Sequence, residues 1–359
     1  MKGLYIHIPF CRSKCFYCSF SSWAGQERLI DNYLKALFLE MEKYRGEWIY
    51  SVFIGGGTPT FLSSSQLRSM LEKIFSVFVL EDESEISIEA NPGTVDQEKL
   101  SLLKNLGINR LSFGAQSTDN NLLRYLGRTH TYEDFIENYF LARKTGFANI
   151  NFDLIYGISG QSVSCWQDTL DQVIKLSPEH LSLYPLTVEE DSVFFTRGEK
   201  TDEDLSAAMF EEAIDRLETA GYRHYEISNF AREGFSCRHN QLYWRNQEYL
   251  GLGASACSYL AGRRAKNAPE IEDYCARIFS GRSTVVEEDI LSAEKTKGET
   301  IILGLRLKEG VFFSPEEELQ YQPALTRCCE QSLLTKTGQR WQLTRRGILL
   351  ANCVFREFI

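Results

Sequence analysis

Short runs of alternating apolar and polar residues recur along the first two thirds of the chain, with longer helical stripes between them. Alternation with a period of two is typical of strands, and apolar residues three or four apart are typical of helices. The clearest amphipathic helix covers residues 26–44. Six strand candidates cover residues 4–9, 51–56, 85–91, 109–115, 149–157 and 180–186. This order predicts an α/β fold of parallel strands joined by crossover helices.

The pattern changes in the last third of the chain. A seventh strand is predicted over residues 222–230, where it would close the α/β unit. Residues 234–260 are rich in Gly, Asn and aromatic side chains and are expected to be extended and loop-bearing. From about residue 287, short helices and a two-strand signature within residues 341–359 indicate a small α+β domain of winged-helix-like type. We therefore divide the chain into residues 1–232, 233–286 and 287–359.

Composition narrows the class of protein. The 359 residues, 43% of them hydrophobic, can bury a large core. A net charge of −10 gives no general attraction to phosphate backbones, so no nucleic-acid partner is expected. No apolar run is long enough to span a bilayer, and the first residues lead directly into a strand pattern. We expect a cytoplasmic protein whose ten cysteines stay reduced or bind metal.

Small or polar residues lie at the ends of several predicted strands. They are Gly55–Thr58, Glu89–Pro92, Gly114–Gln116 and Asp153. Barrels of parallel strands place their chemistry at the C-terminal ends of the strands. The sequence therefore predicts a site at this edge of the sheet.

Three cysteines, Cys11, Cys15 and Cys18, follow the first predicted strand with the spacing Cys-x3-Cys-x2-Cys. Zinc would need a fourth ligand, for which His7 is the local candidate, and a disulfide would leave one thiol over. Three thiolates can instead hold three irons of an iron–sulfur cubane and leave the fourth iron open. We favour the cluster, with zinc and unrelated buried thiols as the alternatives.

The cysteine motif and its surroundings resemble the radical S-adenosylmethionine (SAM) superfamily. The resemblance is carried by "CRSKCFYC" at residues 11–18, "LYIHIPF" before it and "FIGGGTPT" at residues 53–60. It implies a partial (β/α)6 barrel and a [4Fe–4S] cluster on the three cysteines. Its open iron would be chelated by SAM, which an electron then cleaves to methionine and a 5′-deoxyadenosyl radical. A low-potential electron donor such as flavodoxin or ferredoxin is implied as well.

The same resemblance implies a SAM pocket. Its expected members are Tyr5, Gly56, Gly57, Thr58, Glu89, Gln116, Arg128 and Asp153. Glycines permit close backbone approach, Arg128 could pair with the SAM carboxylate, and Asp153 could accept from a ribose hydroxyl. Taken singly, Glu89 and Asp153 are equally well explained as helix caps or partners of Arg, and Tyr5 as a core residue.

Over its whole length the chain resembles oxygen-independent coproporphyrinogen III oxidases and the related radical SAM heme chaperones of HemW type. The oxidases have a longer N-terminal extension. They also have a further cysteine two positions after the third cysteine of the motif, where this chain has Phe20. The chaperones carry a His-Asn-x-x-Tyr-Trp motif, present here as "HNQLYW" at residues 239–244. The resemblance implies heme as a cofactor with His239 as its axial iron ligand, and Cys237 is a second candidate. The alternative is a hydrogen-bonded loop histidine beside packing aromatics.

Two residues depart from the family pattern. Ser19 stands where an acidic residue is expected, and Ser159 stands where proline is usual. Neither removes an expected cluster or SAM ligand. The leading hypothesis is a protein that binds heme and delivers it to an acceptor hemoprotein. The alternatives are an oxidase that decarboxylates coproporphyrinogen III and, disfavoured by the acidic charge, an RNA-modifying enzyme, so whether the chain is an enzyme stays open.

Overall fold

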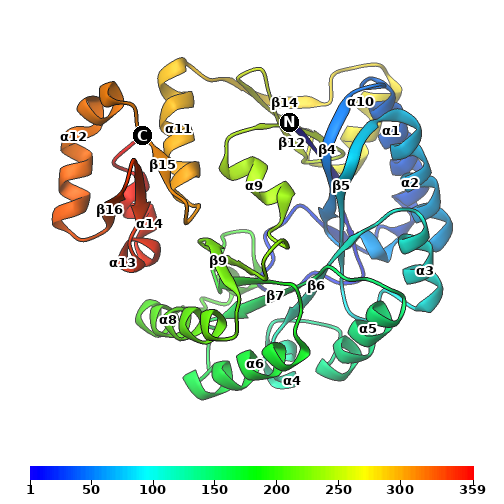
Figure 1. The fold of residues 1–359 in the computed structure, drawn as a ribbon. Coiled ribbons are helices and arrows are strands. Elements are labelled where there is room, and N and C mark those ends of the chain that lie inside the picture. Colours follow the sequence, from blue (N-terminus) through cyan, green and yellow to red (C-terminus); the bar gives the residue numbers. More distant parts are fainter.

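The computed structural model describes residues 1–359, and its centre is one curved sheet of twelve strands (Figure 1). Six successive strands of this sheet are parallel neighbours. They are β1 (Lys2–Ile8), β4 (Trp48–Gly56), β5 (Val79–Ala90), β6 (Arg110–Gln116), β7 (Ile150–Tyr156) and β8 (His180–Pro185). The six predicted strands and the α/β class are therefore confirmed.

Crossover helices cover the outer side of the sheet (Figure 1). They are α1 (Ile30–Glu42), α2 (Ser64–Val77), α3 (Gln97–Asn105), α5 (Tyr132–Lys144), α6 (Val163–Leu176) and α8 (Glu203–Thr219). The short helices α4 (Asn120–Tyr125) and α7 (Val193–Thr196) instead lie beside Phe16. Several begin at a side chain that caps the first turn. Ser63 and Thr131 each form a capping box with the residue three positions on, which satisfies backbone N–H groups that the helix leaves unpaired.

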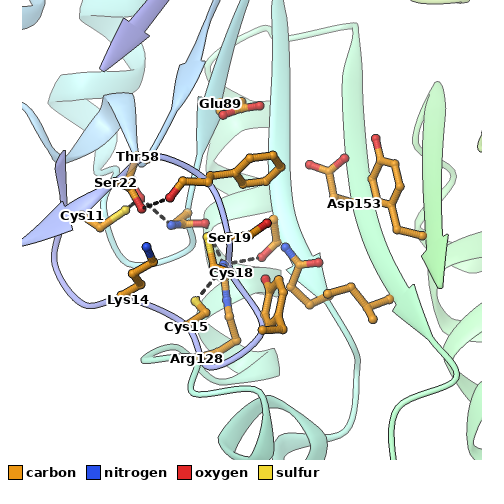
Figure 2. Close-up of a pocket in the computed structure, with 18 of the residues that line it drawn as sticks. Cys11, Lys14, Cys15, Cys18, Ser19, Ser22, Thr58, Glu89, Arg128 and Asp153 are labelled. Carbon is orange, nitrogen blue, oxygen red and sulfur yellow. Dashed lines mark hydrogen bonds between the residues drawn. The ribbon is translucent and has the colours of Figure 1, made fainter. Parts of the chain in front are cut away.

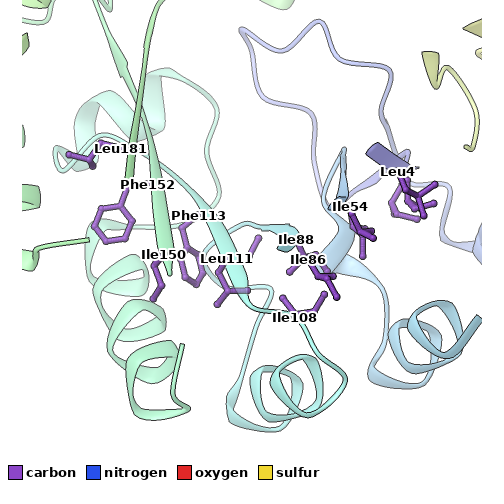
Figure 3. Packing of buried hydrophobic residues seen from close by; sticks show 14 of the residues in the cluster. Leu4, Ile54, Ile86, Ile88, Ile108, Leu111, Phe113, Ile150, Phe152 and Leu181 are labelled. Carbon is purple, nitrogen blue, oxygen red and sulfur yellow. The ribbon is translucent and has the colours of Figure 1, made fainter. Parts of the chain in front are cut away.

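The two faces of the parallel strands differ in polarity. Successive side chains of a strand point to opposite faces. Outward residues such as Ile54, Leu111 and Phe152 are fully buried under the helices, and each contributes roughly 1.5–3 kcal/mol to stability (Figure 3). The residues that alternate with them are mostly polar: Tyr5, His7, Ser51, Glu85, Ser87, Glu89, Arg110, Ser112, Asn151, Asp153, His180 and Ser182. The outer layer holds the fold together, and the inner layer supplies polar groups for a site.

Residues 222–230 do not form the single strand that the sequence predicts. They form a hairpin of β9 (Arg223–Glu226) and β10 (Asn229–Ala231), and β10 is antiparallel to β8. The prediction was wrong because Ile227 and Ser228 reverse the chain direction within the run, and so tight a turn joins only antiparallel strands.

The next segment is also more regular than predicted. Residues 238–244, expected to be extended, form helix α9 (Arg238–Trp244), which lies inside the curve of the sheet (Figure 1). Strand β11 (Glu248–Leu252) then pairs in parallel with β1. The sheet is extended in antiparallel fashion by β12 (Cys257–Leu260), β13 (Arg263–Asn267) and β14 (Val285–Ile290), with α10 (Ile271–Phe279) between the last two.

The C-terminal part combines helices with a small antiparallel sheet. Its elements are α11 (Ala293–Leu305), β15 (Val311–Phe312), α12 (Pro315–Glu330), β16 (Leu334–Thr337), β17 (Arg340–Leu343), α13 (Arg345–Leu349) and α14 (Ala351–Phe355). The two-strand signature predicted within residues 341–359 is wrong, because only the start of that stretch is a strand and the rest is helical. No helix anywhere in the chain combines the length and apolar character needed to cross a membrane.

Candidate functional site: a cysteine-lined cavity at the strand ends

A cavity of about 450 Å³ lies at the C-terminal ends of the parallel strands. It is lined by most of the predicted site residues: Cys11, Cys15, Cys18, Gly56, Gly57, Thr58, Glu89, Gln116, Arg128 and Asp153. The other two, Tyr5 and His239, line a smaller cavity of about 190 Å³ deeper inside the sheet. Glu89 and Asp153 line both cavities, so the two are neighbours. We call them the outer and the inner cavity.

The three cysteines lie on one loop beside the outer cavity (Figure 2). Short strands β2 (Phe10–Cys11) and β3 (Trp23–Ala24) pair and close the base of this loop. The Phe16 backbone N–H donates to the Leu126 carbonyl at 3.0 Å and fastens the loop to the end of α4. Burial raises the pKa of the Cys11 and Cys18 thiols, so both carry protons until a metal displaces them.

Arg128 places a positive charge beside this loop. Its Nη1 lies 3.5 Å from Cys15 Sγ, and its Nη2 donates to Asn91 Oδ1 and to the Gly114 carbonyl, both at 2.7 Å. A guanidinium at this position would offset the anionic charge of a metal cluster bound to the loop. Asn91 also donates to Thr58 Oγ1 at 2.7 Å. Asn91 was assigned no role of its own from the sequence, although it is one of the residues at the ends of the predicted strands.

The donor set fits an iron–sulfur cluster better than zinc. His7, the proposed fourth zinc ligand, donates from Nε2 to the Ser21 carbonyl at 2.8 Å, and its Nδ1 is hydrogen-bonded to the Tyr5 hydroxyl at 2.9 Å. No three His, Cys, Asp or Glu side chains converge on one ion position. A cubane binds its ligands at separate iron corners, and the three thiols along one cavity wall suit that arrangement.

Two glycines bring backbone close to the cysteine loop. Gly56 has φ +116, and a Cβ there would lie 2.7 Å from the His7 ring. A Cβ on Gly57 would lie 2.9 Å from Cys11 Sγ. Both positions therefore require glycine. Gln116, at the end of β6, has φ +65, an uncommon conformation for a residue with a side chain and one that often marks functional sites.

Glu89 and Asp153 lie where the outer and inner cavities meet. Glu89 Oε2 accepts from the Gly56 N–H at 3.0 Å, and burial together with the Asp153 charge raises the pKa of Glu89 to about 8. Asp153 accepts from Ser112 Oγ at 3.0 Å and from Asn151 Nδ2 at 2.9 Å, while burial raises the pKa of Asp153 as well. The Glu89 carboxyl is thus mostly protonated near neutral pH and can donate as well as accept a hydrogen bond.

His239 lies on α9 and is 1% exposed. Its Nδ1 is hydrogen-bonded to Ser51 Oγ and its Nε2 to the Tyr243 hydroxyl, both at 2.9 Å, and its ring stacks on Phe53. Burial lowers the pKa of His239 to about 3, which keeps the imidazole neutral. Both ring nitrogens are engaged, so iron binding would require one partner to move.

The remaining candidates near α9 are held in other contacts. The Cys237 thiol is fully buried and donates to Glu85 Oε1 at 3.3 Å, and burial raises the pKa of Cys237 to about 12. Trp244 packs under the Arg306 guanidinium, 4.1 Å from the ring centre. Of the two aromatic residues of the "HNQLYW" segment, Tyr243 lines the inner cavity and Trp244 does not.

Sequence reasoning missed two residues of the inner layer. Arg110 and Tyr184 both line the inner cavity, and Tyr184 lines the outer one as well. A signal existed for Arg110, because a charged residue stands at the start of an otherwise apolar strand. Tyr184 gave none, since a tyrosine in a strand is ordinary.

A curved parallel sheet with a three-thiol loop beside the C-terminal ends of its strands defines a radical SAM protein. Consistently, the profile of the Radical SAM superfamily matches residues 5–173, and that of the HemN C-terminal domain matches residues 291–350. The chain belongs to the HemW family, as its relatives show. Heme chaperone HemW of Lactococcus lactis is 36% identical, covering 100% of this chain and 97% of the relative. That of Bacillus subtilis is 35% identical, covering 100% and 99%.

A solved structure extends the likeness to three dimensions. Coproporphyrinogen III oxidase (HemN) from Escherichia coli, described as a radical SAM enzyme, superposes with a TM-score of 0.87. The match has 25% sequence identity and covers 99% of this chain and 89% of that one. The likeness therefore includes the C-terminal part as well as the curved sheet.

Proposed function

We propose that this protein is a heme chaperone, which binds heme and transfers it to an acceptor hemoprotein in the cytoplasm. The observation that carries the proposal is the full-length similarity to curated heme chaperones at 35–36% identity. The "HNQLYW" segment adds support, because α9 directs His239 and Tyr243 toward the inner cavity.

The proposal includes a [4Fe–4S] cluster held by Cys11, Cys15 and Cys18, with exchangeable SAM. When bound, the cluster supplies an electron to SAM, drawn from a low-potential donor such as flavodoxin or ferredoxin. Arg128 would neutralise anionic charge next to Cys15. The SAM pocket would be made of Gly56, Gly57, Thr58, Glu89, Gln116, Arg128 and Asp153 around the outer cavity, with Tyr5 behind Glu89.

For heme we propose His239 as the axial ligand. Neutral imidazole is the form that binds iron, and burial keeps His239 in that form. Nε2 would become available when the Tyr243 hydroxyl turns away, while Ser51 continues to orient the ring through Nδ1.

The second candidate function is the oxidative decarboxylation of coproporphyrinogen III. It is favoured by the structural likeness to the oxidase over 99% of this chain. The position of the oxidases' further cysteine is taken here by Phe20, which lines the outer cavity and is 68% exposed.

One anaerobic experiment separates the two functions. The chain is reconstituted with iron and sulfide, and one sample receives heme while a second receives coproporphyrinogen III, SAM and reductant. We expect about one heme per chain by absorption titration and no protoporphyrinogen by chromatography. Efficient conversion to protoporphyrinogen would replace the chaperone proposal with the oxidase.

Two histidine variants test the ligand. His239→Ala is expected to weaken heme binding at least tenfold, because it removes the proposed axial bond. His224→Ala is the matched control, since His224 is also buried but stacks on Phe230 outside both cavities. Equal heme affinity of the two variants would exclude His239 as the ligand.

A further inference from the structure

The inner cavity is too small for a typical whole ligand and can hold only one side group of it. Its volume of about 190 Å³ is below the range of about 300–1,000 Å³ that is usual for whole small-molecule sites. It shares Glu89, Ser112, Asp153 and Tyr184 with the outer cavity. A ligand in the outer cavity could therefore extend a side group past these residues into the inner one.

Arg110 is the cation of this cavity and has no acceptor within the chain. It lines the cavity from the start of β6 and is 2% exposed, and its Nε is buried without a hydrogen-bond partner. The carboxylate of Glu85 is engaged by the thiol of Cys237 and the N–H groups at the start of α9. A buried guanidinium without hydrogen-bond acceptors is costly, and a ligand that enters this cavity could supply them.

Asp153 and Glu89 line the inner cavity together with Arg110, but neither acts as its acceptor. Both oxygens of Asp153 already accept from Ser112 and Asn151. Glu89 has a pKa of about 8, so near neutral pH it is mostly uncharged and can donate a hydrogen bond. Arg110 is then the fixed positive charge of the cavity, opposite the Asp153 carboxylate, and the protonated Glu89 adds no second negative charge beside an incoming anion.

We propose that the inner cavity is a carboxylate pocket in which the Arg110 guanidinium pairs with a carboxylate group of a bound ligand. The planar guanidinium presents paired N–H donors that match the two oxygens of a carboxylate. The carboxylate has two sources: a propionate side chain of a bound porphyrin, or a small free carboxylate. The first of these rests on the proposed function, whereas the pocket itself does not.

The first test uses the full-length, cluster-reconstituted protein without heme. Sodium propionate is expected to raise the Tm in a saturable way, whereas propionamide and sodium chloride at equal concentration do not, because only the carboxylate binds the folded state. Arg110→Met should abolish the rise, and Arg110→Lys should keep part of it. Arg143→Met is the matched control, since Arg143 is half-buried outside both cavities and paired with Glu179.

An equal response to propionate and propionamide in the natural chain would overturn the pocket. This comparison needs no variant, so the proposal stays testable even if Arg110→Met fails to fold.

The second test identifies the source of the carboxylate. The natural chain should bind heme about tenfold more tightly than heme dimethyl ester, and Arg110→Met should bind the two equally. Discrimination that persists in Arg110→Met would overturn the porphyrin assignment. A propionate response without any heme discrimination would assign the pocket to a small free carboxylate. Failure of the natural chain to bind heme at all would count against the chaperone proposal, while the propionate test would still decide the pocket.

Discussion

At the scale of single residues, the inner layer of the sheet imposes unusual protonation states. Glu89 has a pKa of about 8 in the folded chain, against an ordinary glutamate value of about 4.3. Between these two values the folded chain keeps a proton that the unfolded chain has lost. The contribution of Glu89 to stability is therefore fully present below about pH 4 and is lost as pH rises to about 8.

Glu89→Gln should remove this part of the pH dependence. Glutamine can still accept from the Gly56 N–H but does not titrate, so the variant should gain stability relative to the natural chain between about pH 5 and pH 8. Urea denaturation across that range measures the difference. Glu42→Gln is the control, because Arg45 and Lys73 lower the pKa of Glu42 to about 2, so Glu42 does not titrate between pH 5 and pH 8. Parallel pH profiles for the natural chain and Glu89→Gln would show that Glu89 titrates normally.

At the scale of elements, α9 depends on one carboxylate of a distant strand. Glu85 of β5 accepts from the Cys237 thiol and from the N–H groups of Arg238 and His239, at the N-terminus of α9. Negative charge at that end of a helix is favourable, and the first N–H groups have no partner within the helix. This explains why a segment with weak helical propensity forms a helix and places His239 in the inner layer.

Glu85→Gln should lower the free energy of unfolding by about 2–4 kcal/mol, because it weakens charge-assisted hydrogen bonds and leaves buried donors unsatisfied. It should also loosen heme binding through the position of α9. Glu81→Gln, at an exposed position of the same strand, should change stability by less than about 0.5 kcal/mol. Urea denaturation of both variants gives the comparison, and equal stabilities would mean that α9 is held by other contacts.

At the scale of the whole molecule, buried hydrogen bonds join the first helix to the segment that follows the six parallel strands. Glu40 of α1 is 3% exposed and accepts from the Gly253 N–H, Asn267 Nδ2, the Tyr274 hydroxyl and Thr284 Oγ1. All four partners lie beyond residue 250, so one buried carboxyl joins the first helix to the added strands. Residues 233–286 thus share the sheet and the core with residues 1–232, and the three-part division of the chain stays a prediction.

Glu40→Ala should therefore destabilise the entire chain, by about 3–5 kcal/mol, since it leaves several buried donors without acceptors. Glu42→Ala on the same helix should cost much less than Glu40→Ala, because its ion pairs with Arg45 and Lys73 lie at the surface, where solvent screens them. Thermal and urea unfolding measure both. A small effect of Glu40→Ala would mean that water or a neighbouring group replaces the carboxylate.

The sequence by itself determined the features that depend on residues close together in the chain. The alternation of each strand, the cysteine spacing and the polar ends such as Gly56 to Thr58 are local patterns, and they predicted six strands and a site at the strand ends. The resemblance to the radical SAM superfamily added the expected pocket members, such as Arg128, that line the outer cavity. The helix over residues 238–244, the hairpin after residue 222 and the role of Arg110 were decided by the tertiary structure. Each depends on groups distant in sequence: Glu85 stabilises α9, β8 pairs with β10, and the curved sheet encloses Arg110. Contacts between distant residues cannot be predicted from the pattern of apolar and polar positions, because that pattern shows only which face of an element is buried.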